Sequence, residues 1–87
     1  MHEFSLMADL LNKLRSIAQR EHAGRIVKVS VRLGALSHIS PEHFREHFSE
    51  SVKGSPADGA QLEVNVSSDM TDPDAQDILL ESVEVAD

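Results

Sequence analysis

The sequence of 87 residues contains no cysteine, no tyrosine and no tryptophan, and it has only three phenylalanines. Without cysteine the chain can form neither a disulfide framework nor a thiolate zinc site. Its core must therefore be mostly aliphatic. A chain of this length buries only roughly 60–65% of its unfolded surface. We expect one small domain of modest stability, present as a monomer or a weak homodimer.

The sequence also lacks a long apolar run, and it has no basic segment followed by an apolar leader. We therefore expect no membrane partner, no signal peptide and a cytoplasmic location. Basic residues are few, with 8 Lys and Arg against 15 Asp and Glu and a formal net charge of −7. This balance argues against nucleic-acid binding, which requires a basic surface. It is compatible with a cationic ligand or a basic partner surface.

Two segments have the apolar spacing of helices. Residues 4–22 carry a continuous stripe at a period near 3.6, and Gly24 is placed to stop this helix in a left-handed conformation, with His22 in its last turn. The second helix is expected to begin after Ser40, a natural N-cap, with Pro41 at the first helical position. The apolar residues of the two stripes are Leu6, Met7, Leu10, Leu11, Leu14, Ile17, Ala18, Phe44, Phe48 and Val52.

Three other segments have the pattern of strands. Apolar and polar residues alternate in residues 27–33 and 60–67, and residues 78–86 are rich in Val, Leu and Ile. An acidic loop with Pro73 precedes the last of these segments. In the first segment, the residues expected on the buried face are Val27, Val29, Val31 and Leu33. The order helix–strand–helix–strand–strand predicts an α+β fold, with two helices packed on one face of a small three-stranded mixed sheet.

The candidate metal site is the start of the chain, Met1-His2-Glu3. An α-amine has a pKa of about 8 and can bind metal near neutral pH. The Met1 amine, the backbone nitrogen and imidazole of His2, and the backbone nitrogen of Glu3 can chelate one ion. Four nitrogens in a plane suit Ni(II) or Cu(II) better than Zn(II). The simpler interpretation is a polar helix start in which Glu3 complements the helix dipole.

Several stretches together resemble the HypA/HybF family of nickel metallochaperones for [NiFe]-hydrogenase maturation. These are the start MHEFSLMADLL, the run VKVSVRLGALSHISPEHFREHF, the segment GAQLEVN and the end LLESVEVAD. The resemblance implies a nickel domain of two helices and three strands, with nickel bound at His2 and its neighbours Met1 and Glu3. It implies no enzymatic activity, and as partners a HypB-like GTPase and the large subunit of a [NiFe]-hydrogenase.

The sequence departs from the family pattern between the last two strands. Family members carry two Cys-x-x-Cys pairs there in a zinc segment, whereas this sequence has only SSDMTDPDAQD. We therefore expect nickel(II) and no zinc, and a single nickel-binding domain over residues 1–87 without a zinc domain. The alternative is a zinc-less interaction module that docks on the maturation GTPase or hydrogenase without carrying metal.

Other residues carry weaker signals. His43 and His47 lie at i,i+4 spacing, which can bind a metal, but no third ligand is evident, and a solvated or interfacial helix face is the favoured interpretation. His38 is expected to be an ordinary loop residue. An acylphosphatase-like enzyme is a third possibility for the whole chain, opposed by the lack of any phosphate-binding Gly-rich loop.

Overall fold

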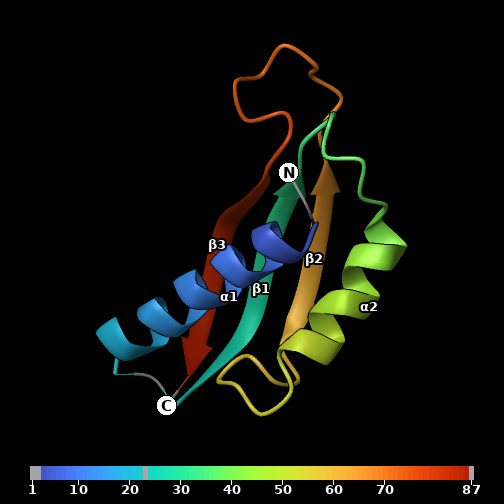
Figure 1. The fold of residues 1–87 in the computed structure, drawn as a ribbon. Helices are drawn as coiled ribbons and strands as arrows, with labels where there is room; N and C mark the ends of the chain where they lie inside the picture. Colours follow the sequence, from blue (N-terminus) through green and yellow to red (C-terminus); the bar gives the residue numbers. More distant parts are fainter. Residues whose placement is uncertain (1–2, 23, 87) are drawn as a thin grey trace.

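The computed structural model describes residues 3–22 and 24–86, with side chains from Ser5 onward. The elements follow in the expected order (Figure 1). They are α1 (Glu3–Arg20), β1 (Arg25–Leu33), α2 (Pro41–Ser51), β2 (Gln61–Val66) and β3 (Ile78–Ala86). The predicted α+β class is confirmed. Neither helix within these ranges combines the length and apolar composition needed to cross a membrane.

The sheet has the strand order β2-β1-β3, with β1 in the centre. β1 runs parallel to β2, where Val29 is level with Leu62, and antiparallel to β3, where Val29 is level with Val83. This is the mixed sheet that the sequence predicts. Both helices lie on the same side of the sheet, as Figure 1 shows, with α1 over β3 and β1 and α2 beside β2. Arg45 of α2 donates to the Leu62 carbonyl oxygen of the edge strand at 2.9 Å.

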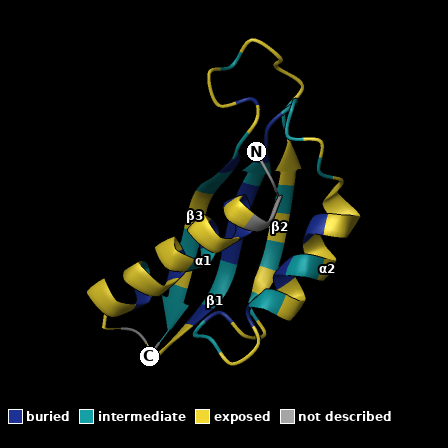
Figure 2. Ribbon diagram, in the orientation of Figure 1, coloured by how far each residue is buried: buried dark blue, intermediate teal, exposed yellow. Residues whose placement is uncertain are grey.

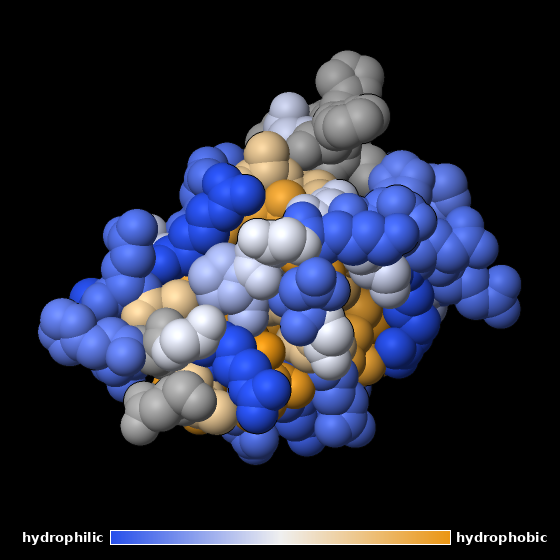
Figure 3. Space-filling model, turned by 90° about the horizontal axis from the view of Figure 1, so that it is seen from below, coloured by the Kyte–Doolittle hydropathy of each residue, from blue (hydrophilic) through white to orange (hydrophobic). Residues whose placement is uncertain are grey.

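The core fills the space between the helices and the sheet (Figure 2). The buried side chains there are mostly aliphatic, and Phe44 and Phe48 join them. They include Leu6, Met7, Leu10, Leu14, Ala18, Ile26, Val29, Val31, Leu33, Phe44, Phe48 and Val52. At the end of the molecule shown in Figure 3, hydrophilic residues cover most of the surface and apolar atoms show only between them. The predicted helix stripes are therefore the buried faces.

Two bulges interrupt the pairing of β1 with β3. Ile26 is level with Val85 and Lys28 with Glu84, so Val27 is an extra residue on β1. Because a bulge shifts the alternation by one residue, Ile26 is only 1% exposed while Val27 is half-buried. The expectation that Val27 belongs to the buried face was wrong for this reason. The second bulge lies between the Ser30 and Val31 pairs and makes Glu81 the extra residue on β3.

The end of α1 also differs from the prediction. The helix ends at Arg20, so His22 lies beyond its last turn rather than within it. His22 itself has the left-handed backbone, with φ of 51°, and its N–H donates to the Gln19 carbonyl oxygen at 3.2 Å. Histidine enters this region more readily than most residues with a Cβ atom. His22 therefore has a left-handed backbone at this helix end, and the conformation expected for Gly24 stays a prediction.

α2 begins as its sequence predicts. The Ser40 hydroxyl oxygen accepts from the His43 backbone N–H at 3.1 Å, and Pro41 takes the first helical position. This capping satisfies one of the N–H groups that a helix start leaves without an intrahelical partner. Phe44 and Phe48 are 0% and 2% exposed, so the apolar stripe of α2 lies against β2 and the core.

The connector between β2 and β3, residues 67–77, folds back onto the turn that follows β1. The Gly34 N–H donates to the Asp77 carbonyl oxygen at 3.0 Å, and the Leu36 N–H donates to the Ala75 carbonyl oxygen at 2.7 Å. At the start of the connector, Ser67 donates its N–H to the Leu33 carbonyl oxygen at 2.9 Å. These bonds hold the connector so that β3 pairs with β1 of its own chain.

Candidate metal centre

The predicted metal site lies mostly outside the described residues. Met1 and His2 are not described, and Glu3 is described only through its backbone, as the first residue of α1. A helix that begins at Glu3 leaves the first backbone N–H groups without intrahelical acceptors. This agrees with the chemical premise of the prediction, in which backbone nitrogens join the chelate. The proposed donor set itself stays a prediction.

The first turns of α1 are held firmly against the sheet. Leu6 and Met7 are 7% and 4% exposed, and Leu10 follows on the same buried face. Burying each such side chain stabilises the folded state by about 1.5–3 kcal/mol relative to leaving it exposed. The residues that precede Leu6 are thus attached to a well-packed segment, which is a suitable base for a site at the start of the helix.

A cleft of about 290 Å³ separates α1 from the end of the connector. Asp9 and Lys13 of α1 line it together with Asp74 and Asp77 of the connector. Although three carboxylates border this cleft, no group of three or more His, Asp or Glu side chains within the described residues is arranged to hold a metal ion. The acidic connector is accordingly not a second metal centre of that kind.

The histidines noted in the sequence take different places. His43 and His47 lie on α2 with ring centroids 4.3 Å apart and ring planes inclined by 41°. His38 lies in the loop before α2, exposed and with φ of 58°. The structure therefore brings His43 and His47 together, as their i,i+4 spacing predicted. His38 is a loop residue, as expected.

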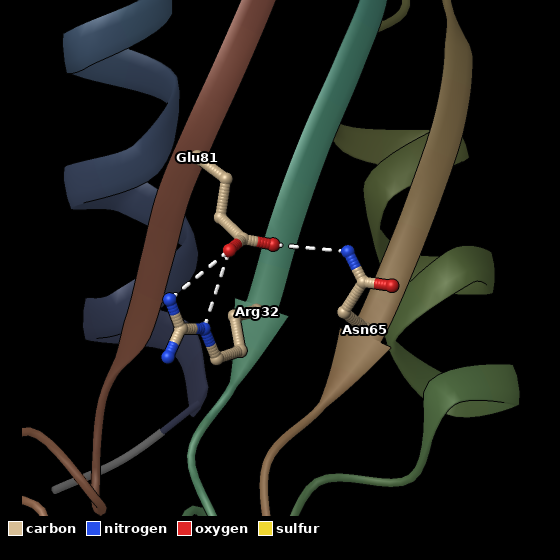
Figure 4. A network of polar contacts seen from close by, with 3 residues as sticks. All are labelled: Arg32, Asn65 and Glu81. Carbon is tan, nitrogen blue, oxygen red and sulfur yellow. Dashed lines mark hydrogen bonds and ion pairs between the residues drawn. The ribbon is translucent and has the colours of Figure 1, made fainter.

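A polar network crosses the sheet face opposite the helices (Figure 4). Glu81 of β3 accepts from Arg32 Nη2 at 3.1 Å and from Asn65 Nδ2 at 2.9 Å, so one carboxylate joins all three strands. The Asn65 hydrogen bond is the main cause that holds the pKa of Glu81 below its usual value of 4.5; desolvation opposes it, and the hydrogen bond and charge of Arg32 lower the pKa further. Sequence reasoning missed this network because the bulge that turns Glu81 toward its partners has no local signal.

Comparison of the sequence with known proteins identifies one family and several relatives. The family described as "Hydrogenase/urease nickel incorporation, metallochaperone, hypA" matches residues 1–71. A hydrogenase maturation factor HypA from Archaeoglobus fulgidus is 36% identical over 66 residues, which are 76% of this chain and 60% of that protein. The corresponding factor from Dechloromonas aromatica is 39% identical over 64 residues, 74% of this chain and 57% of that protein. This chain thus spans about 60% of the length of such relatives.

A solved structure shows the same fold. The solution structure of the nickel metallochaperone HypA from Helicobacter pylori superimposes with a TM-score of 0.80 at 18% sequence identity, covering 99% of this chain and 98% of that one. The fold and the matched description together define a class, the nickel-incorporation metallochaperones. Because the family match covers residues 1–71 of 87, the chain belongs to the HypA family.

Proposed function

We propose that this chain carries Ni(II) at its N-terminus for the maturation of a [NiFe]-hydrogenase. The observation that carries the proposal is the family match, which begins at residue 1 and so includes Met1, His2 and Glu3. The family is described as acting in nickel incorporation. Ni(II) is the cargo in this proposal, held between uptake and delivery.

The chemistry of the site follows from its donors. The Met1 amine, the His2 imidazole and the backbone nitrogens near Glu3 offer a planar nitrogen set that Ni(II) accepts well. Binding displaces protons from these donors, so the affinity rises with pH. A partner can remove such a ligand set stepwise by exchange, because several donors lie on one short segment at the end of the chain.

The proposal includes the partners and organisation that the sequence predicts. The recipient is a hydrogenase large subunit, a HypB-like GTPase assists, and this chain catalyses no reaction. It acts as one nickel-binding domain over residues 1–87, without a zinc domain. The proposed location is the cytoplasm, as the sequence predicts. The cysteine-free connector of residues 67–77 supports the absence of zinc from this chain, because thiolates are the usual ligands of structural zinc.

The test is a Ni(II) titration of the untagged chain by calorimetry and visible absorption. We expect one tight equivalent per chain, lost in His2→Ala and weakened by any N-terminal extension, which removes the free amine. The matched control is His22→Asn, which removes an imidazole elsewhere and keeps a residue that tolerates φ of 51°. Equal stoichiometry and affinity in the wild type and His2→Ala would refute the proposal.

The alternative is an interaction module that docks on the maturation GTPase or hydrogenase without metal. The cysteine-free connector of residues 67–77, in the place where the family pattern has its zinc segment, is the observation that favours it. The same titration separates the two proposals. Absence of tight Ni(II) binding in a chain with a free Met1 amine would favour docking alone.

A further inference from the structure

We propose that His43 and His47 form a second, weaker site for a divalent transition metal on α2, separate from the N-terminal site. The two side chains come from positions one helical turn apart, and their ring centroids are 4.3 Å apart. Imidazole nitrogens are ligands for Zn(II), Cu(II) and Ni(II). The ring planes are inclined by 41° rather than stacked in parallel.

The backbone that carries this pair is well fixed. The His43 N–H donates to the Ser40 hydroxyl at 3.1 Å, so His43 lies in the capped first turn of α2. Phe44 and Phe48, each adjacent in sequence to one histidine, are buried at 0% and 2% exposure. Anchoring by these two rings keeps the histidines on a fixed helix face, which lowers the ordering cost of binding an ion.

The charges of α2 favour a cation. Glu42, Glu46 and Glu50 lie on this helix. Two cations lie near them: Arg45, which donates to the Leu62 carbonyl oxygen at 2.9 Å, and Lys53, whose Nζ lies 3.2 Å from a Glu50 carboxylate oxygen. The three glutamates outnumber these two cations, and an excess of negative charge favours a divalent ion.

Two protein ligands leave room for water on the ion. His43 is exposed, and His47 is half-buried beside a surface hollow that is also lined by Arg45, Glu46, Ser49 and Glu50. No third His, Asp or Glu is arranged with the pair among the described residues. An ion held by two imidazoles and several waters binds more weakly than one in a complete protein site and exchanges quickly.

Zn(II) is the probe that separates this site from the N-terminal one, because a planar four-nitrogen set suits it poorly. The experiment is a Zn(II) titration of the full chain and of the His2→Ala variant, followed by NMR of the imidazole nitrogens. We expect the His43 and His47 signals to shift together in both proteins. Shifts confined to other histidines, or none, would overturn the proposal.

His43→Gln and His47→Gln are the matched variants, since glutamine is a good helix former and should preserve α2. Each should weaken this Zn(II) binding more than about tenfold, because losing a ligand costs more affinity than losing the hydrogen-bond partner of a ligand, which costs about 10–100-fold. His22→Asn should leave it unchanged. A gain in thermal stability with Zn(II) in the wild type, absent in His47→Gln, is the second measurement. Equal Zn(II) affinity in the wild type and both glutamine variants would overturn the proposal. This outcome concerns only the site on α2 and does not depend on the result of the N-terminal nickel titration.

Discussion

Gly34 lies so close to Ala75 that a Cβ atom on the glycine would clash with the Ala75 carbonyl oxygen. The same carbonyl accepts the Leu36 N–H at 2.7 Å. The turn after β1 and the connector before β3 therefore meet backbone to backbone, and only glycine permits that distance. This contact determines where the connector returns the chain to the sheet.

Gly34→Ala should lower the free energy of unfolding by about 3 kcal/mol, the upper part of the range for forced overpacking. The added methyl group meets backbone atoms, which cannot rotate away as a side chain could. Denaturant unfolding followed by circular dichroism measures the change. Gly59→Ala is the control, since no atom lies within 4 Å of the added Cβ and only its φ of 79° is strained, at about 1 kcal/mol. Equal losses in the two variants would contradict the close contact.

Ser40→Ala should destabilise the chain by about 1 kcal/mol, because it removes the acceptor for the His43 N–H. Ser49→Ala is the matched control, as Ser49 is an exposed residue inside α2 where alanine is the better helix former. We expect the two changes to have opposite signs in thermal unfolding. A loss of the same size at both positions would show that the cap contributes nothing specific.

Asn65→Ala should raise the pKa of Glu81 toward its usual 4.5, because the Asn65 amide is the main group that lowers it. A lowered folded-state pKa means that Glu81 stabilises the fold above its unfolded pKa, and this contribution is lost as pH falls through the folded value. NMR titration of the Glu81 carboxyl carbon measures the shift. Gln61→Ala, a change to an exposed amide at the start of the same strand, should leave that pKa unchanged. An unaltered Glu81 titration in Asn65→Ala would contradict the network.

Treatment with a strong chelator should leave the helix content and the thermal midpoint unchanged. The sequence has no cysteine, and the core is formed by apolar side chains from both helices and all three strands. Far-ultraviolet circular dichroism before and after dialysis against the chelator is the measurement. Cooperative loss of helix signal would reveal a structural metal that this prediction excludes.

The chain should be a monomer across a dilution series, because the connector is long enough for β3 to pair with β1 of the same chain. Arg45, which donates to Leu62 on the outer strand β2, also occupies part of one sheet edge. Light scattering coupled to sizing gives the mass. Two masses that exchange slowly with concentration would instead indicate that β3 is swapped between two chains.

Local patterns were enough to predict the elements. A period near 3.6 marked α1 and α2, alternation marked the strands, and Ser40 with Pro41 marked the start of α2. The Met1-His2-Glu3 start suggested a metal site because amine, amide and imidazole donors are adjacent along the chain. Each of these predictions depends on residues within a few positions of one another, and such short-range relations can be read from sequence.

The end of α1 shows where local reasoning fails. α1 ends at Arg20, and His22 has a left-handed backbone that the sequence pattern did not predict. Helix ends fray by one or two residues, so a periodic pattern alone does not fix the last residue of a helix.

The sequence by itself determined the order of elements, the cap of α2 and the apolar faces of the helices, because these follow from covalent geometry and side-chain period. Only the tertiary structure decided which residues meet across long separations. Glu81 reaches Asn65 and Arg32 through a bulge, and Gly34 needs its missing side chain because of Ala75. Strand register and backbone contact depend on how whole segments pack against one another, and no local stretch of sequence contains that information.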